Sequence, residues 1–408
     1  MVPEEVRHKL SDRVFHWVMA CLVITLLGTS FLPILGLKFN WVPIHWISGV
    51  LLILAVIFHL YRALLVHGIR TMVPTGDDLR SIMGSRRSDE EGKYDLNQND
   101  LVVDLGSNDG TLLSGFKEHG IKITGVEPTN IAKIANKKNI ETVQEFFTLD
   151  IAKNIKTKSG EASIILATNM FAHMATIGEV ISGIESLLKP NGVFVFENHY
   201  LLDVIHGGQF DTIYHEHLRT YSLKSLIKLF SYYDFTVTDV ERGTRYGGNI
   251  RVHVTKGKNK NVSKNVESLL KLEEEFGLYE LDTYRKFAVR VKTAKKDFMN
   301  FLFDMKKEGK TIVGNSCPGR SVTLLNYYGV DSDLLPYIAE QSTSLKLDMY
   351  LPGKQIPIVN NEILIQEQPD YVVLLAWHYA TPIMNQLKER GLKSNFVIPL
   401  PDLKILEN

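Results

Sequence analysis

The stretch LVVDLGSNDGTLL, which begins at Leu101, limits the possible folds of this chain more than any other part of it. A short apolar strand ends in Asp104, a glycine-rich turn follows, and then a helix begins. A second apolar run ends in Glu127. Strand, glycine-rich turn, helix and strand open a doubly wound sheet, whose ligand lies beyond the carboxyl ends of the strands. The stretch therefore predicts an α/β fold with a Rossmann-like domain.

The residues of this turn indicate what kind of ligand the sheet binds. The turn reads GSNDG and lacks the GxGxxG spacing that brings backbone close to a dinucleotide pyrophosphate. Asp104 suits a cationic ligand without phosphates, and Glu127 is placed to accept both hydroxyls of a ribose. Together they resemble the S-adenosylmethionine site of class I methyltransferases. The resemblance implies that Asp104, Gly106 and Glu127 hold this cofactor and that Asn108 and Asp109 line it. A glycine turn that only bends the chain is the alternative.

Later strands of the same sheet are expected to end in polar residues. ASIILATNMFAHM reads as an apolar strand that opens into a loop with His173. SLLKPNGVFVFENHYL reads as a helix, a Pro-Gly turn and a buried strand that ends near Asn198 and Tyr200. The stretch FDTIYHEHLRTYS, residues 210–222, comes next. Because strand ends converge on the ligand crevice of an open α/β sheet, we expect this stretch to form a loop over the crevice.

The histidines of that loop do not have the spacing of a zinc site. In HExxH zinc enzymes the two histidines are four positions apart, whereas His215 and His217 are two apart and flank Glu216. No cysteine lies nearby in the sequence, and zinc would need a third ligand from elsewhere. A plain surface loop is the other alternative. The density of ionisable and hydroxylated side chains beside the crevice favours a catalytic cluster without a metal.

Motifs spread over about residues 100–403 resemble one enzyme family. The motifs are GSNDGTLL, GVEPTNIA, NMFAHM, GVFVFENHYLLDVI, FDTIYHEHL, YGGNIR, GKTIVGNSCPGRSVTLLNYYGV, YLPGKQIPI and PDYVVLLAW. They resemble the nucleotide-sugar C-methyltransferases that act on deoxysugars, which implies a second, C-terminal α/β domain. That family begins with a cysteine-bound zinc domain, which this chain lacks. The family's GYGAxAKG turn reads GNSCPGRS here, from Gly314 to Ser321.

The resemblance also implies a mechanism. The family's substrate is a 4-keto deoxysugar carried on a nucleotide and methylated at carbon 3, and its ketone makes the neighbouring proton acidic by delocalising charge as an enolate. By resemblance His217 is the base, Glu216 orients it, and Tyr214 and His173 bind the keto oxygen. Methyl transfer from S-adenosylmethionine to that carbon follows. O-methylation, which needs no adjacent ketone, is the runner-up.

Further substrate contacts are expected from four residues. Asn198 and Tyr200 lie at a predicted strand end, and the motif YGGNIR brings Asn249 and Arg251 toward the substrate. Arg251 is suited to a diphosphate. An outer hairpin with a solvated arginine is the alternative for this motif.

Two runs without charged residues precede the α/β part, Val14 to Leu37 and Phe39 to Tyr61. Each is long enough to cross a bilayer. Arginine and lysine residues flank the pair on its outer sides, so the positive-inside rule predicts a two-helix transmembrane hairpin at residues 14–66 with both ends in the cytoplasm. The predicted location is therefore the inner or cytoplasmic membrane, with a cytoplasmic catalytic part. If the segment is an artefact, a cytoplasmic protein is expected.

Three histidines, His16, His45 and His59, lie in or beside these runs. His45 and His59 would share a helix face about 21 Å apart, a spacing that suits two stacked haems. SDRVFHWVMACLVITLLGTSFLP and IHWISGVLLILAVIFHLYR resemble the first half of a di-haem cytochrome b of the formate dehydrogenase gamma-subunit type. Because the helices that supply the partner ligands are missing, a haem-free anchor is favoured over haem binding. A non-catalytic fusion of such a fragment with a methyltransferase domain is a further alternative.

The overall composition narrows the partners. A formal net charge of zero and a pI near 7.2 leave no basic excess to neutralise phosphates, which argues against nucleic acid. Two cysteines cannot build a disulfide framework or a four-cysteine zinc site. The sequence does not indicate an oligomeric state. The predicted parts are a hairpin at 1–98, a cofactor-binding domain at 99–256, a helical connector at 257–306 and a C-terminal α/β domain at 307–408.

Overall fold

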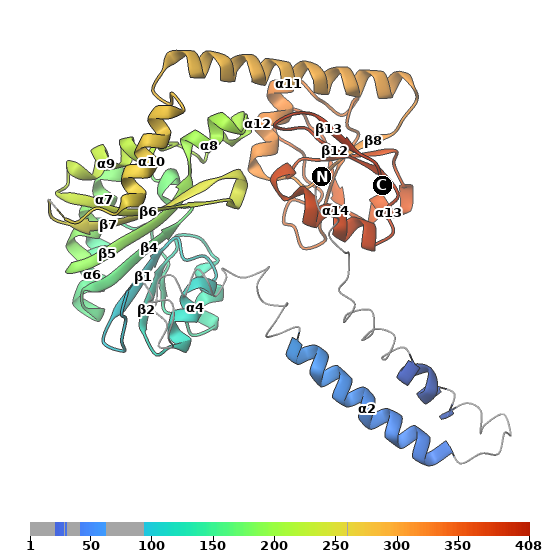
Figure 1. Cartoon of the computed structure of the whole chain (residues 1–408), viewed down its shortest axis with the longest axis horizontal. Helices are drawn as coiled ribbons and strands as arrows, with labels where there is room; N and C mark the ends of the chain where they lie inside the picture. The colour runs from blue at the N-terminus through green and yellow to red at the C-terminus, as the bar shows by residue number, and fades with distance from the viewer. Residues whose placement is uncertain (1–20, 28, 31–40, 63–93, 259) are drawn as a thin grey trace. The chain divides into compact units, whose positions relative to one another are not determined.

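The computed structural model describes residues 21–27, 29–30, 41–62, 94–258 and 260–408 (Figure 1). The chain divides into two compact units, Met1–Asp95 and Leu96–Asn408. The residues that the sequence assigns to catalysis and to cofactor binding all lie in the second unit.

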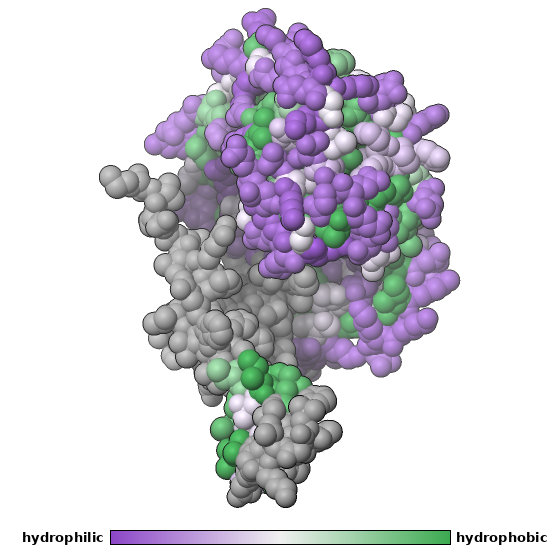
Figure 2. Space-filling view, turned by 90° about the vertical axis from the view of Figure 1, so that its right-hand side faces the viewer, coloured by the Kyte–Doolittle hydropathy of each residue, from purple (hydrophilic) through white to green (hydrophobic). Residues whose placement is uncertain are grey.

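One long helix, α2, is described in the first unit and spans Trp41–Arg62, so it contains His45 and His59. The Nδ1 atom of His45 lies 2.7 Å from the hydroxyl of Thr29. Figure 2 shows apolar residues, in green, on this unit, whereas the second unit presents a largely hydrophilic surface in the same view. His16 lies outside the described residues. Within the described ranges no helix has the length and hydropathy needed to cross a membrane, so the predicted hairpin is not supported there.

A seven-stranded sheet with the strand order β3-β2-β1-β4-β5-β7-β6 opens the second unit. Its strands are β1 (Leu101–Leu105), β2 (Lys122–Val126), β3 (Thr142–Val143), β4 (Ala162–Thr168), β5 (Leu188–His199), β6 (Phe235–Gly243) and β7 (Asn249–Lys256). Strands β1 to β5 are parallel, and β7 runs antiparallel between β5 and β6. Every residue of β1 is buried, as expected of a central parallel strand. The predicted Rossmann-like fold is confirmed.

Helices cover both faces of this sheet, as the doubly wound order requires. They are α4 (Thr111–Glu118), α5 (Ala132–Lys137), α6 (Leu149–Ser159), α7 (Ile177–Leu187), α8 (Leu201–His206) and α9 (Leu223–Ser231), with short 3₁₀ turns η2 (Phe171–His173), η3 (Phe210–Thr212) and η4 (Arg245–Gly247). Phe171 of η2 packs ring against ring with Phe194 and Phe230 in the core. The turn that carries His173 is therefore anchored by a buried aromatic cluster.

Two helices, α10 (Lys264–Glu275) and α11 (Leu281–Lys307), link this sheet to a second one. Glu273 of α10 is fully buried, and its carboxylate accepts hydrogen bonds from the Tyr200 hydroxyl at 2.9 Å and from the backbone N–H of Leu223 at 2.6 Å. Leu223 is the first residue of α9, so its N–H group has no acceptor within the helix. Glu273 thus fastens α10 to the first sheet domain.

The second sheet has the order β10-β9-β8-β11-β12-β13. Its elements are β8 (Ile312–Asn315), α12 (Gly319–Tyr328), β9 (Ile338–Glu340), β10 (Ile358–Asn360), α13 (Glu362–Glu367), β11 (Tyr371–Leu374), η5 (Trp377–Tyr379), α14 (Ala380–Glu389), β12 (Asn395–Ile398) and β13 (Lys404–Leu406). Only β13 is antiparallel. The predicted second α/β domain is confirmed, and its first five strands repeat the order of β1 to β5.

We expect Gly248→Ala to destabilise the second unit strongly. Gly248 has φ +125°, and an added Cβ would lie 2.4 Å from Cβ of Asp203. Gly309→Ala is the matched control, because Gly309 also has a positive φ of +73° but no atom within 4 Å of an added Cβ. Left-handed strain alone costs about 1–2 kcal/mol, and a forced contact adds about 1–3 kcal/mol. Urea unfolding should show the larger loss for Gly248→Ala, and equal losses would contradict the close packing on Asp203.

Candidate active site

The glycine-rich turn after β1 is held against the end of β2. The N–H groups of Gly106 and Ser107 both donate to the carbonyl of Val126, at 2.8 and 3.2 Å. Gly106 has φ +74°, and an added Cβ would lie 2.8 Å from Cγ of Met170 in the loop after β4. The turn therefore requires glycine for its conformation and for its close approach to the neighbouring loop.

Two carboxyl groups flank this turn, and one of them has an unpartnered atom. Asp104 is 3% exposed, and its Oδ1 atom has no hydrogen-bond partner among the described residues. Burial, and then the nearby charge of Glu127, raises the pKa of Asp104 to about 8. Glu127 accepts hydrogen bonds from the backbone N–H groups of Asn108 at 3.2 Å and Thr129 at 2.9 Å. Each of its oxygens keeps capacity for a second donor, as a ribose hydroxyl would provide.

These features fit the cofactor that the sequence predicts. A buried carboxyl without a partner is costly, and a cationic ligand with donor groups would satisfy it. The side chain of Ser107 offers a second buried oxygen without a partner in the described part of the chain. Asp104, Gly106 and Glu127 therefore form a cradle suited to a positively charged nucleoside.

Asp109 has a local structural role in the same turn. Its Oδ1 atom accepts hydrogen bonds from the N–H of Thr111 at 3.2 Å and from the Thr111 hydroxyl at 2.6 Å, so it contacts the residue at which α4 begins. Its Oδ2 atom pairs with Lys138 at 2.7 Å. Asn108 adopts φ +51° between the turn and α4. The contacts of Asn108 and Asp109 with the cofactor stay a prediction.

The structure brings His217, His173 and Tyr214 together. The centroid of the His217 ring lies 4.9 Å from the ring centroid of His173, 4.8 Å from that of His199 and 4.3 Å from that of Tyr214. The Nδ1 atom of His217 lies 2.9 Å from the carbonyl oxygen of Thr212. Because a carbonyl only accepts, Nδ1 carries the proton of the neutral ring. The Nε2 atom, 3.2 Å from the Tyr214 hydroxyl, then holds the lone pair.

The histidines of this cluster are held neutral at pH 7. Burial, and then the neighbouring His173, lowers the pKa of His217 below its ordinary value. Burial likewise lowers the pKa of His173. Burial, assisted by the charges around it, lowers the pKa of His199 to about 3. Burial raises the pKa of Tyr214, so its hydroxyl stays protonated. The cluster therefore offers neutral proton acceptors beside a neutral hydroxyl donor.

The sequence predicts that Glu216 orients His217, but the Glu216 side chain is largely exposed to solvent. Its carboxylate is 55% exposed and is 3.8 Å from Nε2 of His215, which is 85% exposed. The group that hydrogen-bonds to Nδ1 of His217 is the Thr212 carbonyl. A backbone partner of this kind cannot be predicted from the spacing of side chains in the sequence.

Three of the four expected substrate residues gather at the end of β5. Asn198 Oδ1 accepts from the N–H of Ala172 at 3.2 Å, while its buried Nδ2 has no partner among described atoms. Glu197 accepts from Asn249 Nδ2 at 3.2 Å and from Arg251 Nε at 2.7 Å. The Arg251 guanidinium is therefore paired within the sheet. The fourth residue, Tyr200, is fully buried and donates to Glu273, so the structure places it in the core.

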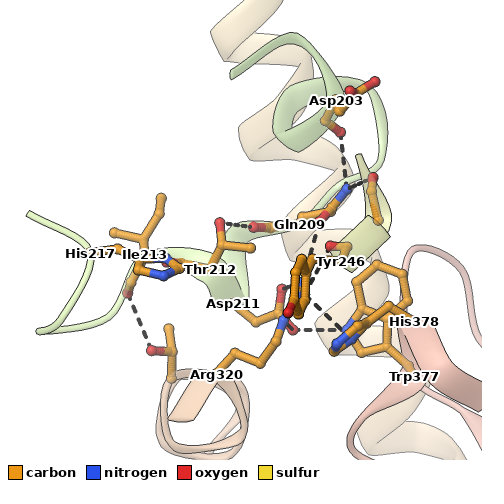
Figure 3. A network of polar contacts seen from close by, with 12 residues as sticks. Asp203, Gln209, Asp211, Thr212, Ile213, His217, Tyr246, Arg320, Trp377 and His378 are labelled. Carbon is orange, nitrogen blue, oxygen red and sulfur yellow. Dashed lines mark hydrogen bonds and ion pairs between the residues drawn. The ribbon is translucent and has the colours of Figure 1, made fainter. Parts of the chain in front are cut away.

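The C-terminal domain supplies residues that the sequence analysis does not predict for this site (Figure 3). Arg320 of α12 is 6% exposed and forms a two-point ion pair with Asp211 of η3. Trp377 and His378 of η5 lie against the same arginine. The usable signals were the altered turn GNSCPGRS and the aromatic pair that follows the predicted strand PDYVVLLA.

Comparison with known proteins identifies the family. Residues 83–240 match a family model described as a methyltransferase domain, and residues 244–401 match one described as the C-methyltransferase C-terminal domain. Over 316 residues the chain is 34% identical to C-methyltransferase NovU of Streptomyces niveus, a match that covers 76% of this chain and 74% of that protein. The chain belongs to the C-methyltransferase family.

This C-methyltransferase is an enzyme that depends on S-adenosylmethionine. Methylation at carbon, rather than the runner-up O-methylation, is thereby confirmed. The similarity to solved structures is more remote. Plantazolicin methyltransferase BpumL is 12% identical with a TM-score of 0.32, over 39% of this chain and 77% of that one. A methyltransferase from Archaeoglobus fulgidus is 16% identical with a TM-score of 0.32, over 38% and 86%.

Binding of S-adenosylmethionine to this C-methyltransferase should release a proton from Asp104. With a pKa of about 8, the Asp104 carboxyl holds its proton at pH 7 before the ligand binds. The positive charge of the ligand favours the carboxylate, so affinity should rise as the pH rises toward 8. Calorimetry at pH 7 in buffers of different ionisation enthalpy measures this release. We expect it in the parent and not in Asp104→Asn.

S-adenosylhomocysteine provides the control. It lacks the sulfonium charge, so its binding should release fewer protons from the enzyme. Equal proton release by the parent and by Asp104→Asn would show that the proton comes from another group.

Proposed function

We propose that this C-methyltransferase acts on a nucleotide-linked keto-deoxysugar and that His217 removes the proton from the carbon to be methylated. The observation that carries the proposal is the state of the His217 ring. Its Nδ1–H points to the Thr212 carbonyl at 2.9 Å, and its Nε2 lone pair points to the Tyr214 hydroxyl at 3.2 Å. A neutral, oriented imidazole is the side chain best suited to accept a proton near pH 7. The family motifs in the sequence support the sugar class.

The proton transfer requires a place for the electron pair that it leaves behind. When Nε2 of His217 takes the proton, the carbon–hydrogen bonding pair moves into the adjacent ketone, and negative charge develops on its oxygen. The Tyr214 hydroxyl donates to Nε2 in the resting site and turns its donor to this oxygen when the substrate enters. His173, whose ring lies 4.9 Å from that of His217, supplies a second donor to the same oxygen.

The cofactor side follows from the cradle after β1. Asp104, Gly106 and Glu127 hold S-adenosylmethionine, which, when bound, supplies an electrophilic methyl group to the deprotonated carbon. Asn198 and Asn249 bind the sugar, because the Nδ2 atom of Asn198 and the Oδ1 atom of Asn249 are buried without partners in the described chain. Arg251 serves to hold Glu197, since contact with a diphosphate would require it to leave a buried ion pair.

Replacement of His217 should stop proton removal and leave the cofactor site intact. The measurement is deuterium uptake from solvent into a nucleoside-diphosphate 4-keto-deoxysugar, with S-adenosylhomocysteine bound so that no methylation competes. We expect His217→Gln to slow uptake by about 10²–10⁴-fold, the usual contribution of a general base. Tyr214→Phe should slow it by about 10²–10³-fold through loss of one oxyanion donor.

His215→Gln is the matched control, because His215 lies two positions away and is 85% exposed. It should exchange at the parent rate, and all variants should bind S-adenosylmethionine like the parent. Parent-like deuterium uptake in His217→Gln would exclude His217 as the base.

A further inference from the structure

Asp211 is a buried carboxylate whose partners come from the C-terminal domain (Figure 3). It is fully buried on η3, and Arg320 donates to it twice, from Nε to Oδ2 at 2.8 Å and from Nη2 to Oδ1 at 2.7 Å. The indole Nε1–H of Trp377 also donates to Oδ2, at 2.8 Å. Three donor groups of the C-terminal domain therefore hold the Asp211 side chain, which belongs to the loop of the first sheet domain.

The residue after Asp211 is the one that contacts the histidine. Thr212 is 2% exposed, and its carbonyl accepts from Nδ1 of His217 at 2.9 Å. Its hydroxyl donates to the carbonyl of Gln209 at 2.8 Å, and Arg320 Nη2 lies 3.4 Å from Oε1 of Gln209. Arg320 thus contacts Asp211, which directly precedes Thr212, and Gln209, whose backbone carbonyl accepts the Thr212 hydroxyl.

We propose that Arg320 is a positioning residue for the reaction: it holds Asp211, and through Asp211 the Thr212 carbonyl, so that His217 keeps its proton on Nδ1 and its lone pair on Nε2. The C-terminal domain thereby sets the tautomer of the histidine. The proposal rests on the proposed function only for the role of His217 as the base.

The tautomer matters because the two ring nitrogens are not equivalent in this site. In a free neutral imidazole side chain the proton prefers Nε2, the nitrogen that must accept the substrate proton here. The hydrogen bond to Thr212 reverses that preference. If the carbonyl moves away, the Nε2–H form returns, and the nitrogen that faces Tyr214 can no longer take a proton.

Neighbouring groups on several sides hold the Arg320 side chain in place. Its guanidinium packs on the Trp377 ring at 4.9 Å, and Nη1 lies 3.4 Å from the carbonyl of Tyr246. Tyr246 adopts φ +56°, a conformation that a large side chain keeps only when its surroundings enforce it. Gly319, the residue before Arg320, lies close to the Tyr214 ring. A Cβ added at Gly319 would lie 2.9 Å from a carbon of that ring, so the backbone beside Arg320 packs tightly on Tyr214.

The test compares Arg320→Met with Arg320→Lys in the full chain. Nitrogen-15 NMR of labelled histidine reports which nitrogen of His217 carries the proton, and the reading needs no substrate. We expect Nδ1–H in the parent, a shift toward Nε2–H in Arg320→Met, and partial recovery in Arg320→Lys, which keeps the charge but not the two-point contact. Deuterium uptake by the keto-sugar should fall by about 10²-fold in Arg320→Met, with unchanged affinity for S-adenosylmethionine.

Arg390→Met is the matched control, because Arg390 also forms an ion pair in the C-terminal domain, with Glu362 at 2.6 Å. It should leave the His217 tautomer unchanged. If Arg320→Met does not fold, the charge-neutral pair Asp211→Asn with Arg320→Gln replaces it and should show the same shift toward Nε2–H. An unchanged Nδ1–H signal in the folded Arg320 variant overturns the proposal. A shifted tautomer with parent-like exchange in His217→Gln would instead overturn the role of His217 and leave the positioning role in place.

Discussion

The ion pair between Asp211 and Arg320 joins two α/β domains at the loop that carries His217. Both side chains are buried, so each loses its hydration and depends on the other for compensation. The geometry meets that demand, because the two-point contact is completed by the Trp377 indole. Removal of one partner from such a pair typically costs about 3–5 kcal/mol. The loop conformation, and with it the Thr212 carbonyl, therefore depends on a contact from the other domain.

Burial of the histidine cluster is the second constraint on the chemistry. A histidine that is protonated at pH 7 could not accept a proton, and burial disfavours the charged form of His173, His199 and His217 alike. The positive charge of Arg320 acts in the same direction on His217. In the proposed mechanism one arginine thus supports His217 in two ways, through the position of its hydrogen-bond partner and through its charge.

The local parts of this site could be predicted from the sequence, because they depend on residues close together in the chain. The turn after β1, with Asp104 and Glu127 at adjacent strand ends, follows from a strand, a glycine turn and a second strand. The meeting of His173 with His217 follows from the rule that strand ends converge at one edge of a parallel sheet.

The other parts depend on contacts that sequence spacing does not reveal. Arg251 meets Glu197 because β7 pairs antiparallel with β5 in one particular register. Tyr200 lies in the core and not in the site, because its hydroxyl donates to the buried Glu273 of α10, 73 positions later in the chain. Arg320 reaches Asp211 across 109 positions and two domains. Such pairs are fixed only by the tertiary arrangement, so the residues that link the two domains had to be found in the structure.

The most direct measurement is a crystal structure of the enzyme with S-adenosylhomocysteine and a nucleoside-diphosphate 4-keto-deoxysugar. We expect the keto oxygen to accept a hydrogen bond from Tyr214 and the carbon to be methylated to face Nε2 of His217 at about 3–3.5 Å, the approach distance of reacting atoms. We also expect Nδ1 of His217 to remain hydrogen-bonded to the Thr212 carbonyl. A sugar whose acidic carbon faces His173 or His199, with His217 turned away from it, would exclude His217 as the base.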